Sequence, residues 1–340
     1  MSSSTDKMRS DLTTADVLEA RRRIAGLALR TPLVRADALS ERLGSEVLLK
    51  LETLQPIGAF KIRGAANALL SLSQEQRRRG VVCASTGNHG RAVAWVARSL
   101  GIPATICLSA LVPEERAKAI EALGARVRRV GRNQDEAMED VAHAVANEGM
   151  TEVSPFDDPQ VISGQGTIGL ELLEERPDLE AILVPLSGGG LAGGIALAAK
   201  TLKPGIRMIG VSMEHGAAMH ESIAAGRPVA VEEVPSLADS LGGGIGLANG
   251  WTFELCGRLL DETVLVSESE IYRGIRHLLL EERQVAEGAA AVGAAALLAG
   301  KIRPKGPTAL VISGRNIGRE ALARIAAGQP VAVGGREISG

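Results

Sequence analysis

Short apolar runs alternate along the chain with longer stretches of helical periodicity. Runs rich in Val, Ile and Leu predict buried strands, and apolar positions three and four residues apart predict helices. The predicted strands are Glu46–Leu51, Gly80–Cys83, Ala104–Leu108, Ala125–Val130, Ala181–Val184, Met208–Met213, Glu262–Val266 and Thr308–Ile312. The clearest helices are Arg91–Leu100, Glu114–Leu123, Asp135–Asn147, Leu191–Leu202 and the alanine-rich Val285–Leu298. Strands that alternate with helices over short connections indicate an α/β fold with a doubly wound, mainly parallel sheet.

One polar stretch interrupts this alternation. Thr151–Gly164 contains two prolines and two adjacent aspartates, and it predicts the longest loop of the chain. We interpret this loop as the return from a smaller α/β unit that is inserted into a larger one. The predicted domains are therefore a large one over residues 1–66 and 156–340 and a small one over residues 67–155.

Composition and charge exclude several classes of protein. The 340 residues suffice for roughly two domains. The formal net charge is −2, and a nearly neutral chain lacks the basic face that a nucleic-acid-binding protein needs. The sequence contains no uninterrupted run of about 18 apolar residues, so it predicts no membrane span. Met1–Asp6 is polar and lacks a signal-peptide pattern, so we expect a cytoplasmic protein.

The cysteines do not indicate a disulfide framework or a zinc site. Cys83, Cys107 and Cys256 lie far apart in the sequence and among apolar residues. Such cysteines are typical of small buried core residues. We therefore expect no metal ligand among them.

A triple-glycine junction follows the predicted strand Ala181–Val184. In open α/β sheets, ligands bind outside the carboxyl ends of the strands. Consecutive glycines allow backbone N–H groups to converge, and the start of the next helix adds partial positive charge, which favours a bound phosphate. A tight structural turn is the alternative interpretation. The residues of this junction are Ser187, Gly188, Gly189, Gly190 and Leu191.

A second junction follows the predicted strand Gly80–Cys83. Its small hydroxyl groups, its amide and the start of a helix suit a carboxylate and a polar substituent of a ring. Taken alone, Ser85 or Thr86 would more simply be helix N-caps, and His89 would be a structural histidine. The residues in question are Ser85, Thr86, Gly87, Asn88 and His89.

Lys61 stands among small and apolar residues in the segment Gly58–Gly64. A desolvated lysine has a lowered pKa and can form an imine with an aldehyde. A solvent-facing lysine at the start of a helix is the alternative. Ser313 adds a hydroxyl at the end of the predicted strand Thr308–Ile312. A phosphate site together with a buried lysine points to pyridoxal 5'-phosphate (PLP).

These motifs occur together in the order found in fold-type II PLP enzymes, which have a tryptophan synthase β-like fold of two open, doubly wound α/β domains. The chain resembles the threonine/serine dehydratase and serine racemase family over about residues 15–320. The motifs are Gly58–Ala65, Ser85–His89, Gly164–Thr167, Ser187–Leu191 and Ser313–Gly314. Within the family, Gly216–Met219 and Ser236–Gly246 are most similar to hydroxyectoine-utilisation dehydratases.

The resemblance implies roles for the residues around the cofactor. Lys61 would bind PLP through an imine and later act as the base at the substrate Cα. The Ser187–Leu191 segment would bind the phosphate, and Phe60 would pack beside the ring. Asn88 would donate a hydrogen bond to the 3-oxygen of the ring, and the Ser85–His89 segment, including Thr86 and Gly87, would bind the substrate carboxylate.

The partner of the pyridine nitrogen determines which chemistry the resemblance implies. Ser313 matches the family's residue at that place, and Glu287 matches a supporting acidic residue near the cofactor. A serine hydroxyl cannot protonate the nitrogen as an aspartate does, so the ring withdraws electrons more weakly. This favours β-elimination of water from a small β-hydroxy amino acid, with a 2-oxo acid and ammonia as products. The substrate would be threonine or serine, or a hydroxylated diaminobutyrate derived from hydroxyectoine.

Three positions depart from the family pattern. Thr86 retains a hydroxyl where racemases have a serine, so a racemase stays the alternative activity. Arg315 replaces a glycine, for which the sequence offers no explanation. Glu214 matches the first ligand of a divalent cation found in relatives, but His220 stands at the second place, and we expect no metal site.

Further expectations follow from the resemblance and from the length of the chain. The family implies a homodimer that acts on a small-molecule amino acid, with neither a nucleic acid nor a membrane as partner. The chain ends at Gly340, which leaves no room for the regulatory domain of biosynthetic threonine deaminases, and we expect a catabolic role. A non-catalytic protein that binds a phosphate ligand on this fold is the remaining alternative.

Overall fold

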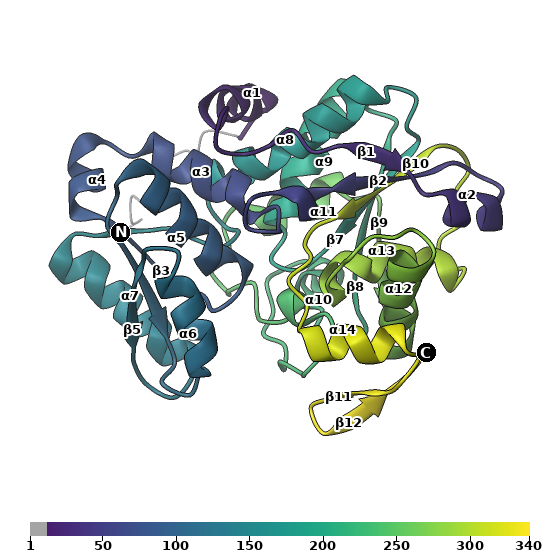
Figure 1. Cartoon of the computed structure of the whole chain (residues 1–340). Coiled ribbons are helices and arrows are strands. Elements are labelled where there is room, and N and C mark those ends of the chain that lie inside the picture. The colour runs from purple at the N-terminus through teal and green to yellow at the C-terminus, as the bar shows by residue number, and fades with distance from the viewer. Residues whose placement is uncertain (1–11) are drawn as a thin grey trace.

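The computed structural model describes residues 12–340 and shows two lobes, each built on its own sheet (Figure 1). All eight predicted strands are present, so the prediction of a doubly wound α/β fold is confirmed. The Met1–Asp6 segment lies outside the described residues. The three cysteines are free and buried, as expected.

The large sheet has six strands in the order β1-β2-β10-β7-β8-β9. Every neighbouring pair is parallel except β1 with β2. Helices cover both faces, which is why strands such as β10 consist of continuous apolar runs. The strands are β1 (Leu33–Arg35), β2 (Val47–Leu51), β7 (Ala181–Pro185), β8 (Arg207–Met213), β9 (Glu262–Val266) and β10 (Thr308–Ile312).

Two helix layers enclose this sheet. The layer of α8 (Pro159–Glu175), α9 (Gly190–Leu202) and α11 (Thr252–Leu259) packs on one face. The layer of α12 (Glu268–Leu280) and α13 (Gly288–Leu298) packs on the other. The alanine-rich α13 is buried from Gly288 to Leu297, because small side chains let the sheet and α12 approach it closely.

The small sheet consists of four parallel strands in the order β5-β4-β3-β6. Its helices are α5 (Asn88–Leu100) and α6 (Glu114–Glu121) on one face and α7 (Gln134–Glu148) on the other. A short helix, α4 (Gln74–Arg79), precedes it. The strands are β3 (Val81–Ala84), β4 (Ala104–Leu108), β5 (Arg126–Arg129) and β6 (Thr151–Glu152).

One helix connects the lobes. The helix α3 (Lys61–Ser71) packs against α5 of the small lobe and α8 of the large lobe. The domain boundary inferred between residues 66 and 67 falls inside this helix. The division into a large domain of residues 1–66 with 156–340 and a small domain of residues 67–155 therefore stays a prediction.

The prediction of a long loop over Thr151–Gly164 is wrong. Residues 151–152 form β6, which pairs with β3, and α8 already begins at Pro159. The Asp158 carboxylate accepts the N–H groups of Gln160 at 2.8 Å and Val161 at 2.9 Å as the N-cap of α8. An aspartate followed by a proline at the first helical position is a typical helix start, so these residues mark a boundary rather than an irregular segment.

Among residues 12–340, no helix combines the length and the apolar character needed to cross a membrane.

Several smaller elements were not predicted from the sequence, because they are short or exposed. The additional elements are α1 (Thr14–Arg23), α2 (Asp37–Leu43), α10 (Ala218–Ala225), α14 (Arg319–Ala326), β11 (Val331–Val333), β12 (Arg336–Ile338), η1 (Glu52–Leu54) and η2 (Asp239–Leu241).

Candidate active site

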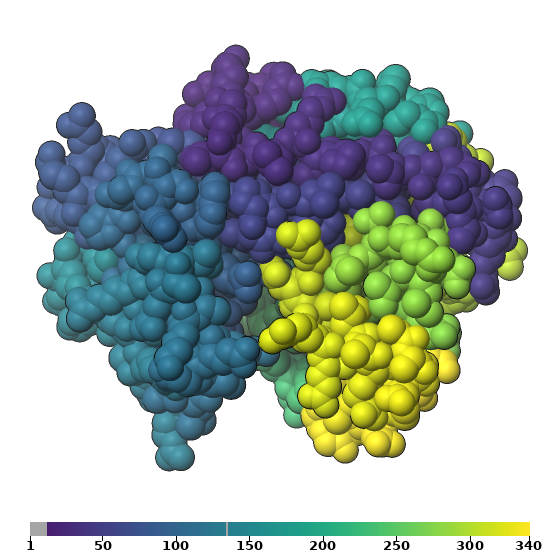
Figure 2. All heavy atoms as spheres, viewed as in Figure 1, coloured from purple at the N-terminus to yellow at the C-terminus, as the bar shows by residue number. Residues whose placement is uncertain are grey.

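A cavity of about 310 Å³ lies between the two lobes, where the surface is hollowed (Figure 2), at the carboxyl ends of the parallel strands. All fourteen site residues predicted from the sequence line it, although they come from five separate segments of the chain. They are Phe60, Lys61, Ser85, Thr86, Gly87, Asn88, His89, Ser187, Gly188, Gly189, Gly190, Leu191, Glu287 and Ser313.

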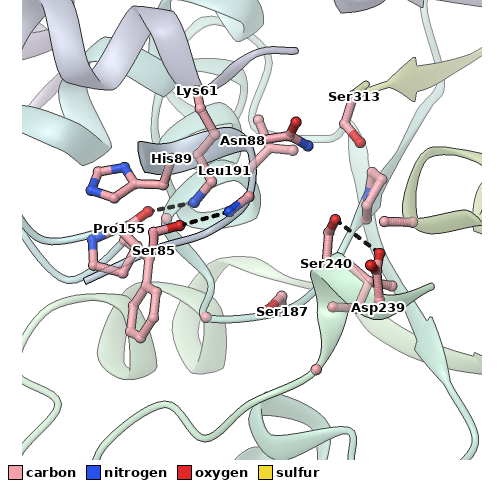
Figure 3. Close-up of a pocket in the computed structure, with 18 of the residues that line it drawn as sticks. Lys61, Ser85, Asn88, His89, Pro155, Ser187, Leu191, Asp239, Ser240 and Ser313 are labelled. Carbon is pink, nitrogen blue, oxygen red and sulfur yellow. Dashed lines mark hydrogen bonds between the residues drawn. The ribbon is translucent and has the colours of Figure 1, made fainter. Parts of the chain in front are cut away.

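Lys61 is the first residue of α3, and its side chain points toward the loop that precedes α8 (Figure 3). Its Nζ donates a hydrogen bond to the Pro155 carbonyl oxygen at 2.5 Å and lies 5.3 Å from the centre of the Phe60 ring. Burial lowers the pKa of Lys61 to about 8, although the Glu287 carboxylate opposes this effect. The alternative of a solvent-facing lysine is therefore wrong, and the amine is available as a nucleophile near neutral pH.

The triple-glycine bend, residues Ser187–Gly190, connects β7 to α9. Gly189 has φ +88°, a left-handed conformation that favours glycine. The helix α9 begins at Gly190 without a side-chain cap, so the N–H groups of its first turn remain open for an anion. A Cβ atom on Gly188 would overlap the Phe156 ring, and this bend therefore requires glycine for close packing as well.

The second junction is also an uncapped helix start. The helix α5 begins at Asn88, and its N-cap is Gly87, which has no side chain to offer. The alternative in which Ser85 or Thr86 is the N-cap is therefore wrong. The Ser85 hydroxyl accepts the Gly87 N–H at 3.3 Å. The N–H groups of the first turn remain open for the carboxylate of a ligand.

His89 has a structural side chain within this junction. The residue is 3% exposed, and its Nε2 lies 2.7 Å from the Val153 carbonyl oxygen. Burial lowers the pKa of His89 to about 3, and the Lys61 charge acts in the same direction. The imidazole is therefore neutral, and its Nε2 donates to Val153, which leaves the backbone of this residue for ligand contacts.

Asn88 and Glu287 form a hydrogen-bonded group on another wall of the cavity. Asn88 Nδ2 donates to Glu287 Oε1 at 2.8 Å, and Asn316 Nδ2 donates to Asn88 Oδ1 at 2.6 Å. The Asn316 backbone N–H donates to the second Glu287 oxygen at 3.0 Å. Burial raises the pKa of Glu287 to about 7, although these donors oppose the effect. Asn316 was not among the residues predicted from the sequence.

Ser313 and Arg315 follow β10, but only the serine faces the cavity (Figure 3). The Phe60 N–H donates to the Ser313 carbonyl oxygen at 2.9 Å, which joins the start of α3 to the end of β10. Arg315 is exposed, and its backbone N–H donates to the Gly58 carbonyl oxygen at 2.9 Å. A Cβ atom on Gly58 would lie 3.1 Å from the Arg315 side chain, so this arginine covers the loop that leads to Lys61.

The cavity also contains polar residues that sequence reasoning missed. Arg116 of α6 lines it from the small lobe. Asp239 and Ser240 of η2 line it from the large lobe (Figure 3). The Ser240 hydroxyl donates to Asp239 at 3.3 Å. No local pattern distinguishes these residues from ordinary surface residues, because only the approach of the two lobes brings them to one cavity.

A buried cluster of four charges lies next to the start of α3. Arg63 donates to Glu52 at 2.8 Å and to Glu171 at 2.6 Å, and Lys50 Nζ donates to Glu171 at 2.6 Å. All four residues are at most 5% exposed. Burial acts to raise the pKa of Glu52, but the Arg63 guanidinium outweighs it and holds this pKa below its usual value. These ion pairs connect α3 to β2 and α8. Arg63 lies two residues after Lys61, so the cluster holds the start of α3 in place.

Each residue of the candidate cation site has a protein partner. Glu214 Oε1 lies 3.6 Å from Lys301 Nζ, and His220 Nδ1 lies 2.7 Å from the Thr263 hydroxyl. Within residues 12–340, no three His, Cys, Asp or Glu side chains gather as a metal site would require.

A partly desolvated lysine and an uncapped glycine-rich helix start, facing one cavity between two doubly wound lobes, define the class of fold-type II PLP enzymes. Residues 24–314 match the family model described as "Pyridoxal-phosphate dependent enzyme". The chain belongs to this family and, within it, to the threonine/serine dehydratase group. It is a PLP-dependent lyase.

Similar proteins with known names support this placement. L-threonine ammonia-lyase of Thermotoga maritima is 44% identical over 92% of this chain and 78% of its own. The catabolic L-threonine dehydratase of Escherichia coli K12 is 39% identical over 89% and 92%. Among solved structures, maize serine racemase has a TM-score of 0.87 at 30% identity over 93% and 97% of the chains. Threonine deaminase isoform 2 of Solanum lycopersicum has a TM-score of 0.86 at 34% identity over 92% and 86%.

The residues present fit PLP. Lys61 offers an amine of lowered pKa for the aldehyde, and the open N–H groups at the start of α9 offer the donors that a phosphate needs. The hydroxyl of Ser313 lies in the same cavity as a partner for a ring nitrogen.

Proposed function

We propose that this enzyme eliminates water from a small β-hydroxy amino acid of the threonine or serine type and releases a 2-oxo acid and ammonia. The observation that carries the proposal is the Lys61 amine, which has a pKa of about 8 and faces the same cavity as the uncapped start of α9. The names of the relatives from Thermotoga and Escherichia support the same reaction.

The proposed roles follow from where each group lies. When bound, PLP draws electrons from Cα of an attached amino acid and makes the Cα proton acidic. Lys61 then takes that proton, because an amine with a pKa of about 8 is partly neutral at physiological pH. The hydroxyl groups of Ser85 and Thr86, the Gly87 backbone and the open N–H groups of Asn88 and His89 at the start of α5 bind the carboxylate.

The remaining groups hold the cofactor. The bend with Ser187, Gly188, Gly189, Gly190 and Leu191 would hold the phosphate, and the Phe60 side chain would pack beside the ring. Asn88, whose amide is oriented by its hydrogen bond to Glu287, would donate to the 3-oxygen. Ser313 would offer the ring nitrogen a neutral hydroxyl, and such a partner would favour elimination over reactions that need a protonated ring.

Replacement of Lys61 tests the proposal. We expect Lys61→Ala to abolish ammonia release and the visible absorbance of the lysine-bound cofactor, while far-ultraviolet circular dichroism stays unchanged. The exposed Lys118→Ala serves as the control and retains both signals. Retained turnover in the Lys61 variant contradicts the mechanism, and a wild-type protein that binds PLP without releasing ammonia favours the non-catalytic alternative.

A racemase is the second candidate, and the Thr86 hydroxyl in the cavity is the observation that favours it. Incubation with L-serine distinguishes the two activities, since elimination yields pyruvate and racemisation yields D-serine. We expect pyruvate as the main product. D-serine as the main product would overturn the assignment.

The finer proposal concerns the substrate side chain. The Asp239 carboxylate on the cavity wall suits a β-hydroxy amino acid with a second amine, such as a hydroxylated diaminobutyrate. We expect Asp239→Asn to raise KM for that substrate and to leave KM for threonine unchanged. Equal effects on both substrates would contradict this role.

We also propose that the enzyme is a homodimer. Sedimentation velocity tests this directly, and a monomer at micromolar concentration would contradict it.

A further inference from the structure

The triple-glycine bend is packed between two segments that are distant in sequence. Phe156, in the loop before α8, covers one side, because a Cβ atom on Gly190 would lie 2.9 Å from its carbonyl oxygen. Residues of α11 cover the other side. A Cβ atom on Gly189 would lie 3.0 Å from Thr252 Cβ and 2.9 Å from Cys256 Sγ. The position of the bend therefore depends on the separation of these two walls.

A single carboxylate joins the walls. Asp157 follows Phe156 directly, and its Oδ1 accepts the backbone N–H groups of Trp251 and Thr252 at 2.9 Å each. Its Oδ2 accepts the Gly250 N–H at 2.8 Å. These donors lie at the start of α11, where the helix dipole favours a negative charge. Three charge-assisted hydrogen bonds thus hold α11 to the loop on the opposite side of the bend.

The same loop contacts the lysine of the site. The Pro155 carbonyl oxygen, two residues before Asp157, accepts the hydrogen bond of Lys61 Nζ at 2.5 Å. The Asp157 carboxylate itself does not line the cavity and contacts neither Lys61 nor the bend directly. Its hydrogen bonds connect the two walls of the bend.

We propose that Asp157 is a positioning residue for the cofactor phosphate, which holds α11 against the loop so that the N–H groups of the bend converge on one anion. This inference rests on the proposed role of Ser187–Leu191 as the phosphate site. Without the carboxylate, the loop and α11 move apart and the bend is less well ordered. Its backbone N–H groups then no longer point toward one phosphate position. The consequence is a loss of affinity that is specific for the phosphate group.

The test compares two cofactor forms, PLP and pyridoxal, which differ only in the phosphate. Each is titrated into apoenzyme, and the visible absorbance of the lysine-bound form reports the dissociation constant. The substitution Asp157→Asn removes the negative charge and replaces one acceptor oxygen by an NH₂ group, which cannot accept from the N–H groups at the start of α11. We expect its dissociation constant for PLP to rise at least about tenfold, as loss of charged hydrogen bonds predicts, and that for pyridoxal to stay within about twofold.

The neighbouring Asp158→Asn is the matched control. It removes the same charge one residue away, but the Asp158 carboxylate caps α8 by accepting the N–H groups of Gln160 and Val161 rather than those of α11. Asparagine is an equally good N-cap, so this variant should bind PLP as the wild type does. If Asp157→Asn does not fold, Asp157→Ser, which keeps one acceptor, takes its place with the same expectation. Thermal unfolding of the apoenzyme identifies the folded variants.

Three results would overturn the reasoning, and they can be told apart. Wild-type affinities for both PLP and pyridoxal in the Asp157 variant contradict the positioning role. An equal loss of both affinities shows a general structural role instead. A wild-type enzyme that binds pyridoxal as tightly as PLP contradicts the phosphate site itself, and with it that part of the proposed function.

Discussion

The Glu287 carboxyl group makes the stability of the cofactor-free enzyme depend on pH. The residue is 5% exposed, and burial raises its pKa from 4.5 to about 7. The folded state therefore binds a proton more tightly than the unfolded state does. The stabilisation is fully present below pH 4.5 and is lost as the pH rises through 7. The substitution Glu287→Gln removes this titration and nearly preserves the shape of the side chain.

The size of the effect follows from the two pKa values. The difference between 4.5 and about 7 corresponds to about 3 kcal/mol in the free energy of unfolding. The wild type should lose about this much stability relative to Glu287→Gln between pH 4.5 and 7.5. Glutamine also alters hydrogen bonds, such as that from the Asn316 N–H. This adds a constant to the difference in the free energy of unfolding between the two proteins and does not change how that difference varies with pH.

Urea unfolding of the apoenzymes at several pH values measures this divergence. The range ends at pH 7.5, because the deprotonation of Lys61, which has a pKa of about 8 and interacts with Glu287, increases steeply above this pH. The exposed Glu281→Gln serves as the control and should run parallel to the wild type. Parallel curves for wild type and Glu287→Gln would show that Glu287 titrates normally and would refute the reasoning.

Two further predictions concern the buried charges and the bend. Arg63→Met leaves two buried carboxylates facing a single lysine and should lower the free energy of unfolding by about 3–5 kcal/mol. Adding Glu52→Gln should cost less than the two single losses together, and additive losses would contradict the coupling. Gly189→Ala places a Cβ at φ +88° and 2.7 Å from Met219 Cε, and should weaken PLP binding in an absorbance titration. Unchanged binding would show that the bend tolerates a side chain.

The strand pattern was predictable because of how parallel sheets are buried. Helices cover both faces of each sheet, so a central strand such as Thr308–Ile312 is buried throughout and is apolar from Ala309 onward, and this run is visible in the sequence. The glycine-rich junctions were predictable for a similar local reason. Close backbone packing and a left-handed φ at Gly189 permit few other residues.

The loop prediction at Thr151–Gly164 failed because local signals are ambiguous. An aspartate and a proline disrupt a strand pattern, yet together they also begin a helix, as Asp158 and Pro159 do in α8. Contacts with residues distant in the chain decide whether such a segment forms a loop or begins a helix. The contact of Asp157 with Trp251 spans 94 positions, and no pattern within either segment indicates it.

By itself, the sequence determined the kinds of groups available: a lysine, a glycine bend, two helix starts after strands and a serine at a strand end. Only the tertiary structure decided their chemical state. Lys61 has a pKa of about 8 and Glu287 one of about 7 because folding removes both from water, and desolvation is a property of all the surrounding atoms rather than of neighbours in the chain. The folded environment, in which two lobes enclose one cavity, turns these residues into an active site.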